Sequence, residues 1–292
     1  MPPNEAITLA QDNRTLFVAA VTIFSLLIGS FLNVVILRLP VMMERAWRRE
    51  ARQMLESDVS FAPDSSSEPI SLAHPPSTCP KCGHRIRARE NVPVLSYLFL
   101  RGRCSQCRER ISPRYPLIEA ATAVLSVLVA LHFGASWLTL AALLLTWALV
   151  ALTMIDIDHQ LLPDSITLPL LWLGLIVNAQ GLLVPLDDAL WGAVFGYLSL
   201  WSVYWGFKLL TGKEGMGYGD FKLLAALGAW LGWQALPMII ILSSLVGAVI
   251  GIAMILLLGR DKNVPIPFGP YLAIAGWIVL LWGETISRHF PL

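Results

Sequence analysis

Residues 137–158 read WLTLAALLLTWALVALTMIDID, an apolar run that ends in two aspartates. Its first 19 residues carry no charge, and a helix that crosses a bilayer needs about 20 apolar residues. We therefore interpret 137–155 as a transmembrane helix whose end brings carboxylates to the membrane surface. Further apolar runs of this kind occur along the chain, and they indicate a helical membrane protein.

The composition supports a membrane protein. Of the 292 residues, 56% are hydrophobic and only 14% are charged, whereas ordinary soluble domains have roughly 25% charged residues. This excludes a soluble globule and a disordered chain, because water cannot solvate so much apolar surface. The formal net charge of +1 argues against a nucleic-acid-binding protein, which needs a basic excess.

Apolar runs of this kind predict an all-α polytopic membrane protein with about eight transmembrane helices. Pro237 interrupts the sequence between the sixth and seventh runs, and seven or nine crossings are the alternatives. The predicted spans cover residues 16–37, 117–133, 137–155, 166–184, 189–210, 221–235, 237–258 and 268–286.

Lysine and arginine predict the orientation, because basic loops stay in the cytoplasm. With eight spans, 19 of the 21 Lys and Arg residues fall on one side, and only Arg14 and Arg288 fall on the other. The segment from Arg38 to Arg114 alone holds 14 of them. We therefore expect this large loop in the cytoplasm and both termini on the outer side of the membrane.

This topology divides the chain into three parts. Residues 1–38 form a membrane anchor, 39–115 a cytoplasmic loop domain, and 116–292 a seven-helix membrane core. The first span lacks a small-x-small cleavage site and its positive flank follows it, so we interpret it as retained rather than as a signal peptide. Within the loop, 42–55 reads as a charged helix and 60–77 as a Ser/Pro-rich linker.

All four cysteines lie in the loop, as two C-x-x-C pairs separated by 21 residues: Cys79, Cys82, Cys104 and Cys107. In a reducing compartment this spacing indicates a structural zinc site, because four thiolates satisfy a tetrahedral divalent ion. A redox dithiol and four unrelated cysteines are the alternatives. Gly83 falls where a tight turn is expected, and His84 reads as a neighbour of the site rather than a ligand.

Two acidic clusters lie at the ends of apolar runs, where ionisable groups are usually functional. One contains Asp156, Asp158 and Asp164, and the other is Gly217-Tyr218-Gly219-Asp220, with Gly215 just before it. On the predicted topology both clusters reach the same membrane face. Two close carboxylates share one proton, which suits general acid and base catalysis of hydrolysis. Asp220 pairs with Asp156, Asp158 or Asp164, and the residues alone do not decide which.

Other hydrolytic or nucleotide-binding motifs are missing from the sequence. It has no phosphate-binding loop, no H-E-x-x-H helix, no G-x-S-x-G elbow and no Rossmann glycine fingerprint. The acidic pair is therefore the best candidate for chemistry.

The chain resembles the bacterial prepilin leader peptidases that also act as N-methyltransferases, members of the G-x-G-D class of intramembrane aspartyl proteases. The matching motifs extend from the first span to the last: Gly29-Ser30-Phe31-x-Asn33-Val34, the two cysteine pairs, Glu90-Asn91-x-Pro93, Arg101-Gly102-Arg103-Cys104, Ile111-Ser112-x-Arg114-Tyr115-Pro116-Leu117-x-Glu119, the 156–164 stretch and Gly217-Tyr218-Gly219-Asp220.

The resemblance implies two reactions at the bacterial inner membrane. The leader of type IV prepilins and type II secretion pseudopilins is cut after a glycine at the cytoplasmic face. The new N-terminal residue, usually phenylalanine, is then methylated with S-adenosylmethionine. By analogy the catalytic pair falls on Asp156 and Asp220, and the cysteine loop is associated with methyl transfer.

Two further assignments concern the methyl donor and the basic leader. The family motif and its nearness to Cys104 point to Arg101, Gly102 and Arg103 for the methyl donor. Local negative charge for the basic leader could come from four residues, among which the sequence does not choose: Glu90, Glu109, Asp158 and Asp164. The alternatives to an enzyme are a transporter or a scaffold with a zinc-binding regulatory loop.

Overall fold

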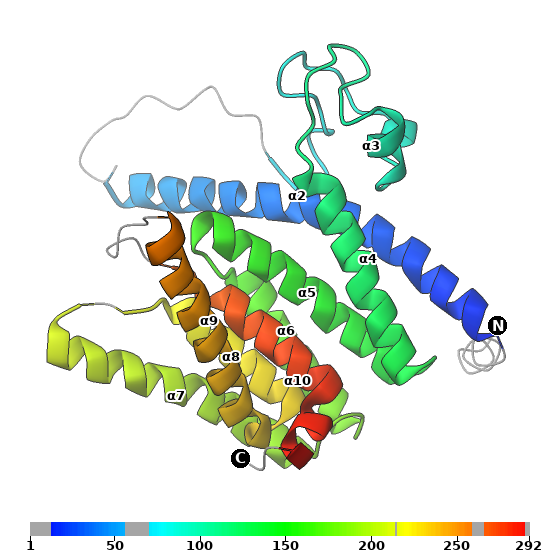
Figure 1. Ribbon diagram of the computed structural model, residues 1–292. Coiled ribbons are helices and arrows are strands. Elements are labelled where there is room, and N and C mark those ends of the chain that lie inside the picture. The colour runs from blue at the N-terminus through cyan, green and yellow to red at the C-terminus, as the bar shows by residue number, and fades with distance from the viewer. Residues whose placement is uncertain (1–12, 56–69, 214, 259–265, 290–292) are drawn as a thin grey trace. The chain divides into compact units, whose positions relative to one another are not determined.

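The computed structural model describes residues 13–55, 70–213, 215–258 and 266–289. These residues form helices without a regular strand (Figure 1). The long helices are α2 (Arg14–Leu55), α4 (Arg114–Phe133), α5 (Trp137–His159), α6 (Asp164–Ala179), α7 (Leu186–Thr211), α8 (Tyr218–Leu231), α9 (Leu236–Leu258) and α10 (Gly269–His289). The shorter ones are η1 (Ala88–Glu90), α3 (Leu95–Phe99) and η2 (Trp233–Ala235).

Each of the eight predicted apolar runs corresponds to one of the long helices, but eight crossings are not confirmed. Among the described residues, five helical stretches are long and apolar enough to cross a membrane: Arg14–Met54, Arg114–Phe133, Trp137–His159, Trp233–Met254 and Gly269–His289. The 16 residues of α6 and the 14 of α8 rise about 24 and 21 Å, short of the bilayer core of about 30 Å. The remaining long helix, α7, is not among these five, and its first turn carries Asp187 and Asp188.

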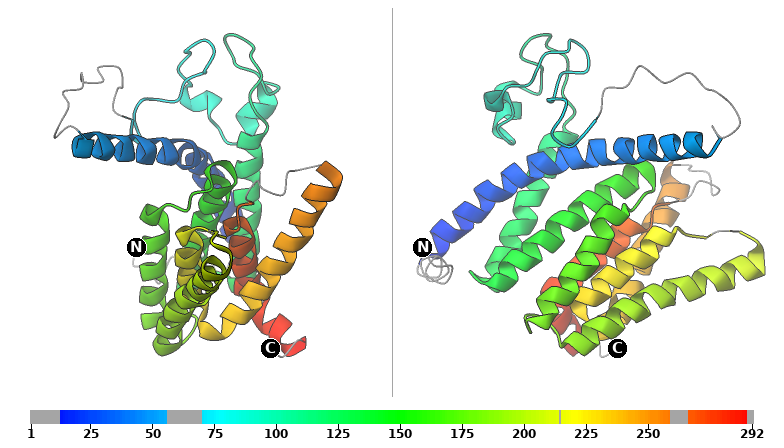
Figure 2. Two further views of the ribbon diagram at one scale, coloured as in Figure 1. Left: turned by 90° about the vertical axis from the view of Figure 1, so that its left-hand side faces the viewer. Right: turned by 180° about the vertical axis from the view of Figure 1, so that it is seen from behind.

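The first helix is longer than predicted. We expected a span over 16–37 and a separate surface helix over 42–55, but α2 runs through Pro40 as one helix of 42 residues. Proline bends a helix without always ending it, and α2 changes direction along its length (Figures 1 and 2). Residues 56–69, which hold much of the expected linker, lie outside the described residues.

The chain packs as two compact units, one of residues 12–128 and one that includes 129–292. In the first, the backbones of α2 and α4 approach closely, because a Cβ added at Gly29 would lie 2.7 Å from Glu119 Cα. Asn33 Nδ2 also donates to the Tyr115 carbonyl at 3.2 Å. The division into parts 1–38, 39–115 and 116–292 follows membrane topology and stays a prediction.

In the second unit α8 is the central helix. It packs against α6, α7 and α10 (Figure 2). Apart from Lys222, its residues from Asp220 to Trp230 are buried, with Phe221, Leu224 and Trp230 fully covered. This explains why hydropathy alone reads α8 as a membrane span, since a helix that is apolar all round is either in lipid or in a protein core.

Polar groups from α6 hold the end of α8. Asn178 Nδ2 donates to the carbonyls of Ala229 and Trp230 at 2.9 and 3.0 Å, and Trp230 Nε1 donates to the Leu170 carbonyl at 2.8 Å. The last carbonyls of a helix have no partner within it, so the amide satisfies groups that would otherwise be buried unpaired.

Candidate functional site

Asp156 lies in the last turn of α5 and is 5% exposed. Its Oδ2 accepts the backbone N–H of Gly269 at 3.0 Å. Gly269 is the first residue of α10, so this N–H has no acceptor within its own helix. The partial positive charge of a helix N-terminus therefore faces the Asp156 carboxylate.

Asp220 lies in the first turn of α8 and is 7% exposed. Its backbone N–H donates to the Gly217 carbonyl at 3.2 Å. The side-chain oxygen Oδ1 is buried and has no hydrogen-bond partner among the described residues. A buried carboxylate oxygen without a partner is costly, and this makes it a place where water or a substrate group would bind.

Leu162 brings the two aspartates together. A Cβ added at Gly219, beside Asp220, would lie 2.8 Å from Leu162 Cβ. A Cβ added at Gly269 would lie 3.1 Å from Leu162 Cδ1 and 2.6 Å from Asp156 Oδ2. The negative charge of Asp156 also acts on Asp220. Segments whose aspartates are 64 positions apart in the sequence thus meet around one leucine.

The glycines of the second cluster do not have equal roles. Gly219 must be small because it touches Leu162, and a Cβ at Gly215 would lie 3.0 Å from the Phe207 ring. Gly217 has room for a side chain, since its nearest neighbours would be 3.9 Å away. Close backbone approach is therefore required mainly at Gly219.

The other two aspartates of the first cluster have different surroundings. Asp158 and Asp164 are exposed. Both carboxylate oxygens of Asp164 lie 2.7 Å from Lys222 Nζ, and this ion pair joins the start of α6 to α8. Burial therefore distinguishes Asp156 from its two rivals, which the residue pattern did not do.

The acidic residues considered for leader binding mostly have internal partners. Asp164 pairs with Lys222, Glu109 with Lys81, and Glu90 Oε2 with His84 Nε2 at 3.1 Å. Each of these three carboxylates therefore already has a polar partner within the chain. Asp158 also interacts within the chain.

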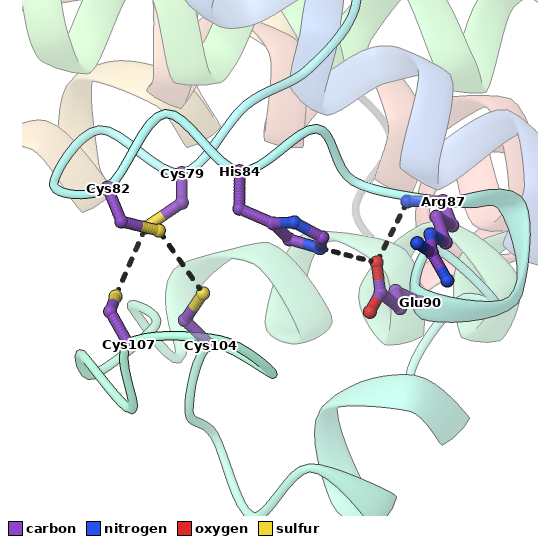
Figure 3. A network of polar contacts seen from close by, with 7 residues as sticks. All are labelled: Cys79, Cys82, His84, Arg87, Glu90, Cys104 and Cys107. Atoms are coloured by element: carbon purple, nitrogen blue, oxygen red, sulfur yellow. Dashed lines mark hydrogen bonds and ion pairs between the residues drawn. The ribbon is translucent and has the colours of Figure 1, made fainter.

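The four cysteines cluster as their spacing predicts (Figure 3). Their sulfur atoms all lie within 4.8 Å of one another, with 3.7 Å between Cys79 and Cys107 and 4.0 Å between Cys82 and Cys104. Four thiolates about 2.3 Å from a tetrahedral ion would be separated by about 3.8 Å, whereas a disulfide requires about 2.05 Å. The geometry fits a metal ion and contains no disulfide.

Both C-x-x-C pairs fold in the same way. The N–H groups of Cys79 and Cys104 donate to the carbonyls five residues ahead, and the residue before each pair forms an antiparallel bridge, Thr78 with Arg85 and Arg103 with Arg110. The residue after each pair has a positive φ, 69° at Gly83 and 61° at Arg108. The second pair therefore makes the same turn without a glycine, at the cost of a less favourable conformation.

Two of the four thiols have pKa values shifted in opposite directions. Backbone N–H groups of Cys82 and Lys81 lower the pKa of Cys79 to about 6. The Glu109 amide lowers the pKa of Cys107, but desolvation and the neighbouring thiols outweigh it and raise that pKa to about 12. A divalent cation would remove this conflict, because it stabilises all four thiolates together.

His84 lies beside the four-cysteine cluster but takes no part in it (Figure 3). Its imidazole meets Glu90, which also accepts the Arg87 N–H at 2.9 Å. Hydrogen bonds from the Arg87 amide, Ser105 and His84 lower the pKa of Glu90 to about 2. The expectation that His84 is a neighbour rather than a ligand agrees with these contacts.

The Arg101-Gly102-Arg103 turn follows α3. Gly102 is buried with φ 66°, and a Cβ there would lie 2.8 Å from the Tyr97 hydroxyl, so both backbone and space require glycine. Arg101 and Arg103 are exposed.

Sequence reasoning missed two residues of the aspartate site, Leu162 and Gly269. A leucine beside a cluster of aspartates carries no signal of its own. Gly269 stands between Phe268 and Pro270 at the start of the last apolar run, and this helix-start pattern is the clue that could have found it.

Comparison with known proteins covers both halves of the chain. Residues 23–133 match the bacterial peptidase A24 N-terminal domain, and 143–252 match the type IV leader peptidase family. No solved structure matches the chain.

Relatives are similar over almost the whole length. The prepilin leader peptidase/N-methyltransferase of Aeromonas salmonicida is 61% identical over 97% of both chains. That of Pseudomonas aeruginosa is 61% identical over 94% of this chain and 93% of its own, and that of Neisseria gonorrhoeae is 53% identical over 91% of each. With its membrane-length apolar helices, the chain is a multi-pass membrane protein that belongs to the type IV leader peptidase family.

Proposed function

We propose that this protein removes the leader peptide of type IV prepilins and type II secretion pseudopilins after a glycine, and then methylates the new N-terminal residue. The activities named for its relatives and its peptidase family support this proposal. The single observation that carries the cleavage step is the buried pair Asp156 and Asp220, with one Asp220 oxygen left unpartnered.

The aspartate pair supplies the groups that peptide hydrolysis needs. Two carboxylates in a buried site share one proton. The ionised member removes a proton from water, whose oxygen attacks the scissile carbonyl carbon, while the protonated member donates to the carbonyl oxygen. The C–N bond then breaks as the leaving nitrogen takes a proton from the pair. The Gly269 N–H holds Asp156 in place, and the unpartnered Asp220 Oδ1 is the open position for water or substrate.

A cleavage assay with purified full-length enzyme and prepilin tests this assignment. We expect Asp156→Asn and Asp220→Asn each to lower the cleavage rate at least 100-fold. Asp158→Asn and Asp164→Asn are matched controls that should retain activity within about fivefold, since an exposed ion pair such as Asp164–Lys222 is worth about 0–1 kcal/mol. Full activity in both Asp156→Asn and Asp220→Asn would refute the pair.

We place the protein in the bacterial inner membrane with the large loop and the aspartates facing the cytoplasm. The distribution of Lys and Arg supports this orientation. A prepilin carries a basic leader before a hydrophobic helix, so its scissile bond would lie at the cytoplasmic interface, where the ends of α5 and α8 present Asp156 and Asp220. A transporter would instead carry its acidic groups near mid-membrane.

Zinc would be held by Cys79, Cys82, Cys104 and Cys107, and its chemistry there would be structural, because four thiolates leave no open coordination position. S-adenosylmethionine would supply the methyl group, which moves from its sulfonium to the new N-terminal amine as the amine loses a proton. We assign Arg101, Gly102 and Arg103 to its surroundings by family motif, supported by the exposure of both arginines.

The metal proposal has a separate test. We expect the double substitution Cys79→Ser and Cys104→Ser to abolish bound zinc, measured by elemental analysis, and methylation, measured by mass spectrometry of the product, while cleavage falls less than threefold. Lys81→Ala, within the first pair, is the control and should retain zinc. An equal loss of cleavage would show that the metal supports the whole fold.

A further inference from the structure

The loop domain exposes a set of large apolar side chains close together in the sequence. Val92, Leu95, Leu98 and Phe99 are 41, 53, 64 and 84% exposed. Single exposed apolar residues are common on soluble surfaces, but a cluster within eight residues marks a contact with lipid or another protein.

Three of these side chains share one face of α3, and Val92 lies just before the helix. Leu95 is spaced three and four residues from Leu98 and Phe99, so the three lie on one side of the helix. Tyr97 faces the opposite way, into the domain, where its hydroxyl approaches the Ile111 carbonyl and the space beside Gly102. The domain thus has its own packed side, and the apolar face is left outside it.

A hydrogen bond ties α3 to a membrane-spanning helix within the same compact unit. The N–H of Val94, which precedes α3, donates to Glu119 Oε2 at 2.8 Å. Glu119 is 8% exposed and lies five residues into α4, about 7.5 Å along its axis. Tyr115 and Leu117, 39 and 65% exposed, lie in the same first turns of α4. The start of α3 is therefore held at the depth where α4 enters the membrane.

Cationic groups accompany the apolar face. Arg101 and Arg103, which directly follow α3, are both exposed. Their backbone is held against the helix, because the N–H of Arg101 donates to the Leu98 carbonyl and that of Arg103 to the Leu100 carbonyl, both at 3.1 Å. Apolar side chains beside arginines are typical of segments that lie at a membrane interface. The apolar side chains enter the acyl region, and the arginines lie near anionic headgroups.

From this arrangement we propose that α3 is an interfacial membrane anchor. Val92, Leu95, Leu98 and Phe99 insert into the bilayer surface next to α4, and the positive charge of Arg101 and Arg103 favours a membrane surface that carries anionic phospholipid. The anchor holds the cysteine domain against the membrane. It does not depend on the cleavage or methylation reactions.

Photocrosslinking of the full chain tests the anchor. The photoreactive residue p-benzoylphenylalanine is placed at position 99, and the protein is reconstituted into vesicles of phosphatidylethanolamine and phosphatidylglycerol. Mass spectrometry then quantifies phospholipid adducts. The control positions are Gln106, exposed in the second cysteine pair, and Leu117, on the surface of α4. We expect position 99 to give at least tenfold more lipid adduct than position 106, at a level comparable to position 117.

A matched variant checks that the face is responsible. Leu95→Glu with Leu98→Glu should lower the adduct at position 99 at least fivefold and leave that at position 117 unchanged, which also shows that the variant is folded and inserted. Adduct at position 99 no higher than at position 106 would overturn the anchor. So would adducts at position 99 that form with added prepilin in place of lipid, because the face would then be a substrate-docking surface.

Discussion

Gly269 links the start of α10 to Asp156, and it has no space for a larger residue. A Cβ at this position would lie 2.6 Å from Asp156 Oδ2, so Gly269→Ala must displace either the carboxylate or the helix start. Misplacing a catalytic group by 1 Å can cost about 100-fold in rate. We expect a 10- to 100-fold fall in kcat/KM for prepilin cleavage.

Gly206 provides the control for this prediction. It lies on the exposed side of α7 with nothing within 4 Å of an added Cβ, so Gly206→Ala should leave cleavage unchanged. Equal rates for Gly269→Ala and the native enzyme would show that the Gly269 contact does not position Asp156.

Glu90 has a pH signature of its own. Its pKa falls from an ordinary value of 4.5 to about 2 in the folded chain, so the stabilisation it supplies is complete above about pH 4.5 and is lost as the pH falls toward 2. Protection of the Arg87 amide, measured by hydrogen exchange and corrected for the intrinsic rate, should therefore decline over this window. Glu90→Gln should show weaker protection at pH 7 and no such decline. The same pH dependence in both proteins would contradict this role.

Among the helices, α7 and α8 approach most closely where glycines face each other. A Cβ added at Gly228 would overlap the Gly192 carbonyl, and one at Gly196 would lie 2.6 Å from the Leu224 carbonyl. These contacts involve backbone, which cannot turn aside as a side chain can. Glycine here allows the α7 backbone to pack against α8, whose first turn carries Asp220.

We expect Gly228→Ala to destabilise the protein by at least about 1–3 kcal/mol, the usual cost of overpacking. Thermal unfolding in detergent, followed by the loss of monodisperse protein, would measure it. Gly206→Ala should raise stability slightly, by about 0.5–1 kcal/mol, because alanine is the better helix former. A thermal midpoint for Gly228→Ala at or above that of Gly206→Ala would contradict the close packing of α7 and α8.

At the scale of the whole molecule, the number of crossings decides where the termini lie. Eight crossings place both termini on the same side of the membrane, whereas the five helices that meet the length and apolarity requirement would place them on opposite sides. The basic loop favours eight, because 19 of the 21 Lys and Arg residues then share the cytoplasmic side.

Reporter fusions distinguish the two arrangements. We expect alkaline phosphatase, which is active only outside the cytoplasm, to be active when fused to either terminus. A fluorescent protein inserted within residues 56–69 should fluoresce, as it does in the cytoplasm. Activity at one terminus only would show an odd number of crossings, and at least one of α6, α7 and α8 would then not cross.

The sequence pattern predicted the parts of the molecule that depend on local chemistry. Apolar runs located the eight long helices, and two C-x-x-C pairs predicted four sulfur atoms within reach of one ion. It was wrong about the break in α2, because a proline is as compatible with a bend as with a helix end. It also did not determine whether α8 crosses the membrane, since burial in protein and burial in lipid select the same residues.

The sequence by itself determined that this is a helical membrane protein with a four-cysteine cluster and two acidic clusters, because composition and spacing act over short stretches of chain. Only the tertiary structure decided that Asp156, rather than Asp158 or Asp164, is buried beside Asp220. That choice depends on where α10 begins and on how Leu162 lies against Gly219 and Gly269. These contacts join segments that are far apart in the chain. A local sequence pattern does not specify which side chain is buried when such segments pack together.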